Sequence, residues 1–529
     1  MDCKIYILIL YFCCTLKISS GFNVDVSHPI VISNIADGPS SYFGASVQIF
    51  KKSDDLSWVI IGAPRANSTY SNHLNITEPG VVWRCSLGKA SDACEVVMMD
   101  PTNVSDVRER AVRDKKDGGW LGASLSSDKS DRFVTCASRW ANQRFAYDVN
   151  YPDSNEFFLH GICYWRPKQD LLEDTMQDLP PNYRLLPLSH VDDLPNQGDF
   201  MWTFGQSGFS QHITSENKLI LGAPGISLWR GSVILYSDTD QGFRLQRNGQ
   251  PEALANTFAN NLTVRSNLGN TVSEYGYFGY AVNSGNFFNT NPNEKVQYVG
   301  GAPRAALLSG QVIIFNFPKS KLEPLEKLQV INGTQIGSYF GSVLCVVDIN
   351  RDGFDDLIVG APHFSTTRTT ILPIKFESLK DDKGSDEGDE GAAFVFISTG
   401  ESLIQQGVLQ GDNKPDSQFG SAISTVGDLN QDGFNDLVIS APYSKKGQGS
   451  IYIYHGTAKG VQSKYSQVVH ASEISSSLRG FGYSLSSGVD FDSNGYNDLA
   501  VGSMYTAQVV ILRTRPAVFL TGSLKTSVT

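Results

Sequence analysis

Short apolar segments recur along the chain, and several of them alternate apolar with small or polar residues. The alternation is clearest over 231–236, 310–315 and 449–454, each of which begins with glycine. A period of two is typical of β-strands that bury one face. After residue 21 no stretch has eighteen consecutive apolar residues, so the sequence predicts no membrane-spanning helix. Many glycines between short apolar segments indicate an all-β protein.

These segments belong to a unit that occurs seven times. A unit opens with an aromatic residue and glycine, and about twenty residues later a second strand ends in Gly-Ala-Pro or a variant. The units begin near residues 43, 121, 204, 278, 340, 419 and 481. The weakest copies open with Trp120-Leu121-Gly122 and with Phe204-Gly205, the latter extending to Phe209. A unit of roughly 60–80 residues holds four short strands and their loops, which is one propeller blade.

A single blade cannot cover both faces of its sheet, so the array must close or hide its ends. Seven units therefore predict a closed seven-bladed β-propeller over residues 22–516. The segment 23–26 precedes the first unit, and we expect it to supply the outer strand of the last blade. The glycine after each aromatic residue is expected where strands crowd near the central axis, and the aromatic residues themselves as core.

Three units carry a carboxylate-rich loop between their first two strands, at 348–356, 428–436 and 490–498. Oxygen-bearing side chains stand at positions 1, 3, 5 and 9 and glycine at position 6, and the carbonyl at position 7 adds a ligand. This pattern suits three structural Ca²⁺ ions. The predicted ligands are Asp348, Asn350, Asp352, Phe354 and Asp356; Asp428, Asn430, Asp432, Phe434 and Asp436; and Asp490, Asp492, Asn494, Tyr496 and Asp498.

The competing interpretation is an EF-hand, which needs a carboxylate at position 12. Position 12 is instead Val359, Ile439 or Val501, each inside a predicted strand. A nine-residue calcium loop within a β-hairpin is therefore favoured. In the fourth unit the corresponding stretch 285–291 has no carboxylate, so no metal is predicted there.

Composition and cysteine use indicate an extracellular protein. The 529 residues carry 43 Lys and Arg against 54 Asp and Glu, a net charge of −11, which disfavours a nucleic-acid-binding surface. Residues 1–21 are typical of a secretory signal peptide. Five later cysteines predict disulfides Cys85–Cys94 and Cys136–Cys163 and a buried free thiol at Cys345. Glycosylation sequons occur at Asn67, Asn75, Asn103, Asn261 and Asn332.

No catalytic motif is found in the sequence. The eight histidines are scattered without ligand spacing, and neither a nucleophile elbow nor a phosphate-binding glycine loop is present. The acidic run 381–390 is expected to be a solvated loop. We therefore predict a protein that is not an enzyme.

The aromatic-Gly and Gly-Ala-Pro units, with calcium loops confined to the last blades, resemble the FG-GAP repeats in the N-terminal propeller of integrin alpha subunits. The segments 79–85, 134–140 and 512–516 look closest to the alpha-four/alpha-nine type. Only about forty residues separate the second and third units, too few for the inserted domain of some alpha subunits. Residues 517–529 resemble the start of a following thigh-like β-sandwich, cut short.

The resemblance implies the extracellular part of a single-pass cell-surface adhesion receptor. Such a subunit pairs with an integrin beta subunit and binds extracellular-matrix or cell-surface protein ligands, with its calcium loops on the opposite face. The aromatic residues that would receive the beta subunit correspond to Trp120, Phe209, Tyr280 and Tyr483. The ligand-contacting positions correspond to Leu228, Trp229, Phe200 and Glu274, with a leucine where family members often have tyrosine.

Two alternatives from other classes remain open at this point. One is a secreted calcium-binding, lectin-like propeller that needs no partner subunit. The other is a secreted enzyme carrying a calcium-stabilised propeller, which would require a separate catalytic domain. No spare segment of about 150 residues is present for such a domain.

Overall fold

The computed structural model describes residues 23–33, 38–53, 56–70, 73, 75–87, 94–100, 113–127, 132–143, 157–167, 184–185, 204–239, 242–244, 246–247, 250–252, 272–289, 295–317, 325–366 and 388–516. The predicted signal peptide, the residues after 516, Phe200, Asn103 and Asn261 lie outside these ranges. In the described part of the chain, no helix has the length and apolar character needed to cross a bilayer.

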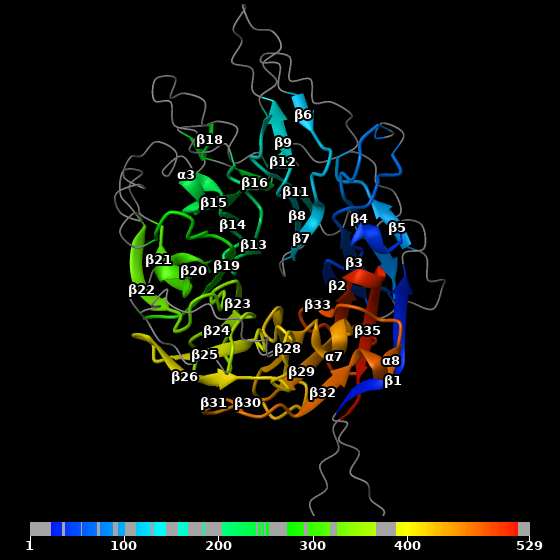
Figure 1. Cartoon of the computed structure of the whole chain (residues 1–529), viewed down its shortest axis with the longest axis vertical. Helices are drawn as coiled ribbons and strands as arrows, with labels where there is room; N and C mark the ends of the chain where they lie inside the picture. The colour runs from blue at the N-terminus through cyan, green and yellow to red at the C-terminus, as the bar shows by residue number, and fades with distance from the viewer. Residues whose placement is uncertain are drawn as a thin grey trace, which may run out of the picture.

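Seven four-stranded antiparallel sheets stand in a ring in the described ranges, which confirms the predicted seven-bladed β-propeller. Figure 1 shows the chain passing once round the ring, from blue to red. Blades 1 to 3 are β2 (Ser46–Ser53), β3 (Leu56–Ala63), β4 (Val81–Ser86) and β5 (Cys94–Val97); β7 (Leu121–Ser127), β8 (Arg132–Ala137), β11 (Ile162–Pro167) and β12 (Arg184–Leu185); and β13 (Gln211–Ile213), β14 (Leu219–Ala223), β15 (Ser232–Thr239) and β16 (Gly242–Arg244).

The remaining blades follow the same order. Blades 4 to 7 are β19 (Ala281–Gly285), β20 (Gln297–Ala302), β21 (Gln311–Asn316) and β22 (Glu326–Asn332); β23 (Val343–Val347), β24 (Asp356–Ala361), β25 (Ala392–Ser398) and β26 (Leu403–Leu409); β27 (Ile423–Gly427), β28 (Asp436–Ala441), β29 (Ser450–Tyr454) and β32 (Gln467–His470); and β33 (Phe481–Leu485), β34 (Leu499–Ser503), β35 (Gln508–Thr514) and β1 (Val24–Ser33).

The loops between these strands contain short strands and helical turns. The small sheets are β6 (Arg113–Lys115), β9 (Ala141–Gln143) and β10 (Phe157–Phe158); β17 (Gln246–Arg247) with β18 (Gln250–Glu252); and β30 (Gly456–Thr457) with β31 (Gly460–Val461). The helical turns are η1 (Pro39–Ser41), α3 (Ile226–Trp229), α6 (Ala305–Leu308), α7 (Ser444–Gly447), α8 (Ala471–Ile474) and η3 (Met504–Thr506).

The ring closes through β1, as the sequence predicts. β1 is the outer strand of blade 7 and pairs antiparallel with β35, with Val24 opposite Thr514 and Ile30 opposite Ile511. In Figure 1 the blue strand lies beside the red one. One sheet thus contains both the first and the last described strands of the chain, and blades 7 and 1 pack against each other through a shared hydrophobic cluster, so neither leaves an uncovered sheet face.

The hydrophobic core lies mainly between neighbouring blades. The aromatic residues that open the units are almost fully buried: Phe43, Phe278, Phe340, Phe419 and Phe481. Each contacts rings or aliphatic side chains in its interblade cluster, for example Phe340 with Phe394 at 5.2 Å between ring centroids. Their role is core packing, as expected.

The glycine after each aromatic residue lies where both backbone conformation and space require it. Gly44 has φ +89°, and a Cβ atom there would lie 2.9 Å from the carbonyl oxygen of Gln508. Gly341 has φ +91° and would be equally close to Gln311. A side chain at either position would be strained and would also push neighbouring blades apart.

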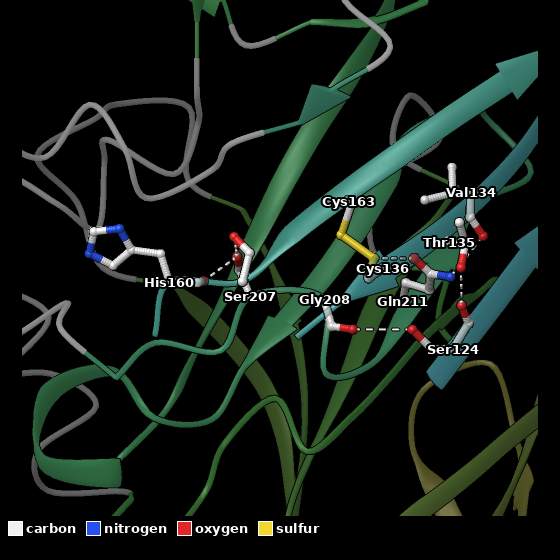
Figure 2. The surroundings of a disulfide bond; sticks show 10 residues. Ser124, Val134, Thr135, Cys136, His160, Cys163, Ser207, Gly208 and Gln211 are labelled. Carbon is white, nitrogen blue, oxygen red and sulfur yellow. Dashed lines mark hydrogen bonds between the residues drawn. A yellow bond between two sulfur atoms is a disulfide. The ribbon is translucent and has the colours of Figure 1, made fainter. Parts of the chain in front are cut away.

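Blade 3 corrects one detail of the predicted repeat. The glycine equivalent to Gly44 is Gly208, whose N–H donates to the Gly222 carbonyl, and not Gly205. Ser207 stands where five other blades have phenylalanine and blade 2 has Leu121, and its hydroxyl donates to the His160 carbonyl at 2.6 Å. Figure 2 shows Gly208 beside the Cys136–Cys163 disulfide. A Cβ on Gly208 would lie 2.4 Å from the Cys163 sulfur, so the disulfide leaves no space for a side chain at this glycine.

Four of the seven junctions between blades share a serine hydrogen bond near the axis. A serine two residues after the repeat glycine donates its hydroxyl to the glycine carbonyl of the next blade. The four bonds are Ser484 to Gly44 (2.8 Å), Ser46 to Gly122 (2.6 Å), Ser124 to Gly208 (3.1 Å) and Ser210 to Gly279 (2.9 Å). The equivalent residues of blades 4 to 6 are Ala281, Val343 and Ala422, which have no hydroxyl group.

Candidate functional site

The first strand of each blade begins at one face of the propeller and ends at the other. The residues before and after these strands therefore lie on two opposite faces. The first strands of neighbouring blades pack together around the axis. In blade 5, Tyr339 precedes β23 and the acidic loop 348–356 follows it. A five-residue strand separates them by roughly 15 Å. We call the face with the residues that precede the first strands the upper face, and the face with the acidic loops the lower face.

On the lower face, the last aspartate of each acidic loop is completely buried and organises the loop. In loop 5 (348–356), Asp356 accepts the N–H of Ile349 at 3.0 Å and the N–H of Ser398 at 2.8 Å. Asp436 in loop 6 (428–436) and Asp498 in loop 7 (490–498) accept the corresponding pairs of N–H groups. Each carboxylate therefore ties its loop to the end of the third strand in blades 5 and 7, and to β30, just after the third strand, in blade 6.

The first aspartate of each loop sets the turn. In loop 5, Asp348 accepts the N–H groups of Asp352 at 3.2 Å and of Gly353 at 3.0 Å. Asp428 and Asp490 make the same two bonds in loops 6 and 7. Gly353 has φ +93°, which explains glycine at position 6. The recurrence of the turn in three blades shows that the loop sequence specifies a local fold.

The donor set of loop 7 fits one hard divalent cation. One carboxylate oxygen from each of Asp490, Asp492 and Asp498 lies within 4.8 Å of the other two, the one such group of three among the described residues. In loops 5 and 6 position 3 is asparagine, and Asn350 and Asn430 donate to the carboxylates of Asp352 and Asp432 at 2.8 Å. Several anionic or amide oxygens on a tight loop are the ligands that Ca²⁺ takes in proteins.

Burial and the crowding of negative charge perturb two of these carboxyl groups. Burial, with Asp352 and Asp348 nearby, raises the pKa of Asp356 to about 7. Burial, with Asp492 and Asp490 nearby, raises the pKa of Asp498 to about 7 as well. A bound cation would favour the ionised carboxylates and so lower both pKa values.

Blade 4 shows how the same turn is built without carboxylates. Gln297 occupies the place of Asp356, and its side-chain oxygen accepts the N–H groups of Phe287 at 2.7 Å and Phe288 at 3.1 Å. Both phenylalanines are buried. In the described part of this turn a neutral amide and two apolar side chains thus take the place of the charged loop, and the absence of a metal there stays a prediction.

On the upper face, two of the four predicted beta-subunit contacts are in direct ring contact. The rings of Phe209 and Tyr280 are 4.7 Å apart. Burial raises the pKa of Tyr280 to about 12, and Tyr339 and Tyr483 add smaller effects in the same direction. Trp120 instead packs against the Arg139 guanidinium, 4.7 Å from its ring.

The sequence reasoning missed four tyrosines that extend this aromatic cluster. Tyr339 contacts Tyr280 at 5.7 Å between ring centroids, and Tyr505 contacts Tyr483 at 6.2 Å. The others are Tyr42 and Tyr443, both also in ring contact with Tyr505. Tyr42 and Tyr339 directly precede repeat phenylalanines, a signal that was available in the sequence. We call Phe209, Tyr280, Tyr339, Tyr483, Tyr505, Tyr42 and Tyr443 the aromatic cluster.

The predicted ligand loop also lies at the upper face. In α3, Leu228 is 61% exposed and Trp229 lies between the rings of Phe204 and Tyr277, at 6.4 and 5.5 Å. Glu274 forms an ion pair with Arg230 at 2.9 Å. The structure therefore brings Leu228, Trp229 and Glu274 into one region.

Three of these upper-face loops contain consecutive non-glycine residues in the left-handed conformation. In α3 they include Ser227 and Leu228, in α6 Ala306 and Leu307, and in α7 Lys445 and Lys446. Such a conformation disfavours L-residues. It directs exposed side chains outward, and Leu307 is 81% exposed.

Both predicted disulfides are present, Cys85–Cys94 between β4 and β5 and Cys136–Cys163 between β8 and β11. Cys345 is a buried free thiol, and burial raises its pKa to about 12. Of the five sequons, Asn67, Asn75 and Asn332 are exposed on the described surface.

Comparison with known proteins finds similarity to the FG-GAP repeat family and to integrin alpha subunits. The FG-GAP repeat family matches residues 340–372, 419–454 and 481–512, which are parts of blades 5, 6 and 7. Integrin alpha-PS3 of Drosophila melanogaster is 33% identical over 515 residues, covering 92% of this chain and 42% of its own length. Integrin alpha-4 of Xenopus laevis is 30% identical over 98% of this chain and 44% of its own length.

The chain is a homologue of integrin alpha subunits. Integrin alpha-V of Gallus gallus is also similar, at 29% identity over 98% of this chain. The similarity to integrin alpha-4 is consistent with the alpha-four-like segments of the sequence. This integrin alpha homologue spans less than half the length of these relatives.

Proposed function

We propose that this propeller is the ligand-binding head of a cell-surface adhesion receptor subunit and has no catalytic role. The observation that carries the proposal is the aromatic cluster at the upper face, in a propeller homologous to integrin alpha subunits over nearly the whole chain. Tyr483 is 37% and Tyr505 39% exposed, so partner side chains can reach the cluster. Exposed aromatic anchors are typical of protein interfaces.

The partner of this surface is an integrin beta subunit. Its docking element would present a cation or an apolar side chain to the rings of Tyr280, Tyr339 and Tyr483, since aromatic faces attract both. Phe209 and Tyr280 form the rigid floor of the site because their rings pack against each other. Trp120, under Arg139, belongs to the periphery of this interface.

Ligands would be extracellular-matrix or cell-surface proteins, bound beside the beta subunit through Leu228 and Trp229. Phe200, predicted for the same surface, lies outside the described residues. Arg230 neutralises Glu274, so this region offers no unpaired carboxylate at that position for a basic ligand residue. The groove therefore favours an apolar ligand contact, with an acidic ligand side chain held by the beta subunit's metal ion.

On the lower face, loops 5, 6 and 7 would each hold one Ca²⁺ through the side chains at positions 1, 3, 5 and 9 and the carbonyl at position 7. The ions would supply positive charge to carboxylates that are already crowded and partly buried. A signal peptide over 1–21, N-linked glycans, and a thigh-like domain beginning at 517 complete the proposal for an extracellular subunit.

Purification from native membranes tests the receptor role. An antibody to this chain should recover a beta subunit in a one-to-one complex, and substitution of Tyr280 and Tyr483 by alanine should abolish recovery. The chain eluting alone while binding immobilised glycans would instead support the lectin-like alternative.

Ligand binding is tested separately with Trp229→Ala. This substitution should weaken cell adhesion without changing calcium-dependent melting, because Trp229 is half-buried on the upper face, far from the lower-face loops. Unchanged adhesion would remove Trp229 from the site.

A further inference from the structure

The three acidic loops are physically connected to one another through the residue at position 8 of each loop. This position lies between two proposed metal ligands, the carbonyl at position 7 and the aspartate at position 9, but is not a ligand itself. It is Asp355 in loop 5, Asn435 in loop 6 and Asn497 in loop 7. In each case its side chain reaches the preceding blade.

Asn435 connects loop 6 to loop 5. Its side-chain amide donates at 2.7 Å to the backbone carbonyl of Asp348, which is the first proposed ligand of loop 5. The two loops also pack closely elsewhere: a Cβ atom on Gly456 would lie 2.3 Å from the Asn435 carbonyl and 3.1 Å from that of Ile349. Asn435 is half-buried in this contact.

Asn497 connects loop 7 to loop 6 in the same way. Its side-chain amide donates at 2.8 Å to the carbonyl of Val426, two residues before the first ligand of loop 6. In the other direction, Gln431 of loop 6 donates to the Gly495 carbonyl of loop 7 at 3.2 Å. Gly427 has φ +72°, and a Cβ there would lie 2.3 Å from the Asn497 amide nitrogen, so the contact leaves no space for a side chain.

Asp355 anchors this series on the turn after β19 in blade 4, where no metal is predicted. Its carboxylate accepts the backbone N–H of Asn286 at 2.7 Å, and its own N–H donates to the Asn286 carbonyl at 2.9 Å. The Asn286 side chain in turn donates to the Gly353 carbonyl at 2.9 Å. Loop 5 is therefore held by a turn that needs no ion.

From these contacts we infer that calcium binding at loops 5, 6 and 7 is cooperative, with Asn435 and Asn497 as the positioning residues that couple the sites. The inference rests on the proposed calcium binding. An ion held by Phe434 and Asp436 fixes the backbone on both sides of Asn435, and Asn435 then holds the first ligand of loop 5 in place. The second ion therefore meets a loop that is already ordered and loses less conformational entropy on binding.

The test is a calorimetric Ca²⁺ titration of the full chain after removal of metal with a chelator. Wild-type protein should take up three ions with a Hill coefficient above one. Asn435→Ala and Asn497→Ala should each retain three ions but lower the Hill coefficient and weaken the overall affinity by about five-fold or more. Asp432→Ala, which disables loop 6, should weaken the two remaining ions as well as removing one.

Gln211→Ala is the matched control. Gln211 in β13 of blade 3 also bridges two blades through its side-chain amide, which donates to the Val134 carbonyl of blade 2 at 2.9 Å, outside the blades that carry the acidic loops. In chelator this variant should have the same melting temperature as Asn435→Ala. Its Ca²⁺ titration should nevertheless match that of the wild type. If Asn435→Ala does not fold, Asn497→Ala tests the same coupling at the next junction.

Three ions bound independently by wild type, or identical titrations for Asn435→Ala and Gln211→Ala, would overturn the coupling while leaving the calcium proposal intact. No calcium uptake by wild type would overturn both. Loss of one ion in Asp432→Ala with unchanged affinity for the other two would also contradict it.

Discussion

The seven junctions between blades are of two kinds. Junctions 7/1, 1/2, 2/3 and 3/4 carry the serine hydrogen bond near the axis. Junctions 4/5, 5/6 and 6/7 carry the position-8 bridge on the lower face, through Asp355, Asn435 and Asn497. The first kind depends on neutral groups within the chain. The second joins loops that crowd negative charge, so its strength is tied to the ions we propose there.

Covalent reinforcement follows the same division. Blades 1 and 2 contain the two disulfides, whereas the acidic loops are in blades 5 to 7. A small four-stranded sheet buries limited apolar area, and either a covalent or an ionic link can supplement it. We therefore expect a reductant to destabilise blades 1 and 2, and a chelator to destabilise blades 5 to 7.

The largest effect is expected from removing calcium. With free Ca²⁺ at 100 times the dissociation constant, each site would contribute about 2.7 kcal/mol to the free energy of unfolding. Chelation should therefore lower the melting temperature strongly and increase hydrogen exchange first in blades 5 to 7. Thermal melting with exchange mass spectrometry measures both. Uniform exchange in all seven blades would show that the two kinds of junction do not differ.

Removing the longer disulfide should have the next largest effect. Cys136→Ser with Cys163→Ser opens a link between residues 27 apart in sequence, and such a cross-link contributes about 3 kcal/mol. The loss should be the same in calcium and in chelator, because the bond lies in blade 2. A loss that appears only in chelator would indicate that the two reinforcements act on one common junction.

Disabling one loop should cost about as much as one ion. Asp352→Ala and Asp432→Ala should each lower stability in calcium by about 2.7 kcal/mol for the ion lost, and coupling between the sites would add the weakened binding of the neighbouring ions. In chelator the loss should be smaller than in calcium, because there each substitution removes only the hydrogen bonds that the carboxylate accepts, such as that from Asn350 or Asn430, and relieves repulsion between carboxylates. Chemical denaturation in both buffers gives the comparison, and equal losses in the two buffers would refute metal ligation.

The smallest effect belongs to the serine bonds. Ser46→Ala removes a buried hydrogen bond to the Gly122 carbonyl and should cost about 1 kcal/mol, regardless of calcium. Ser421→Ala is a suitable control, because the Ser421 hydroxyl bonds only locally, to the Gln418 carbonyl of its own blade. If Ser46→Ala lowered the free energy of unfolding only in the presence of calcium, the serine junctions would not be independent of the ions.

Much of this architecture could be predicted from sequence because repeats multiply weak signals. Seven copies of a pattern fix the blade number, and three copies of the acidic loop fix its boundaries. The predicted start of blade 3 at Phe204-Gly205 is wrong because Ser207 stands where five other units have phenylalanine, and the hydrogen bond of Gly208 to Gly222 is what identifies the repeat glycine. In blade 4, Gln297 stands in place of the buried aspartate of loops 5 to 7, and only its hydrogen bonds reveal this equivalence.

The upper face was less predictable. Residues of the aromatic cluster come from several blades, and their spacing in sequence does not show which rings meet. The left-handed turns at Leu228 and Leu307 contain no glycine, so no local signal marks them. The position-8 bridges were missed because Asn435 and Asn497 look like ordinary loop residues until the neighbouring blade is in place.

The most direct test of the central claim is a crystal structure of the chain grown with Ca²⁺, with anomalous scattering used to locate the ions. The account predicts three peaks, one in each of loops 5, 6 and 7, with none at the turn 285–291 of blade 4. Absence of these peaks, or an ion bound in blade 4 instead, would contradict it.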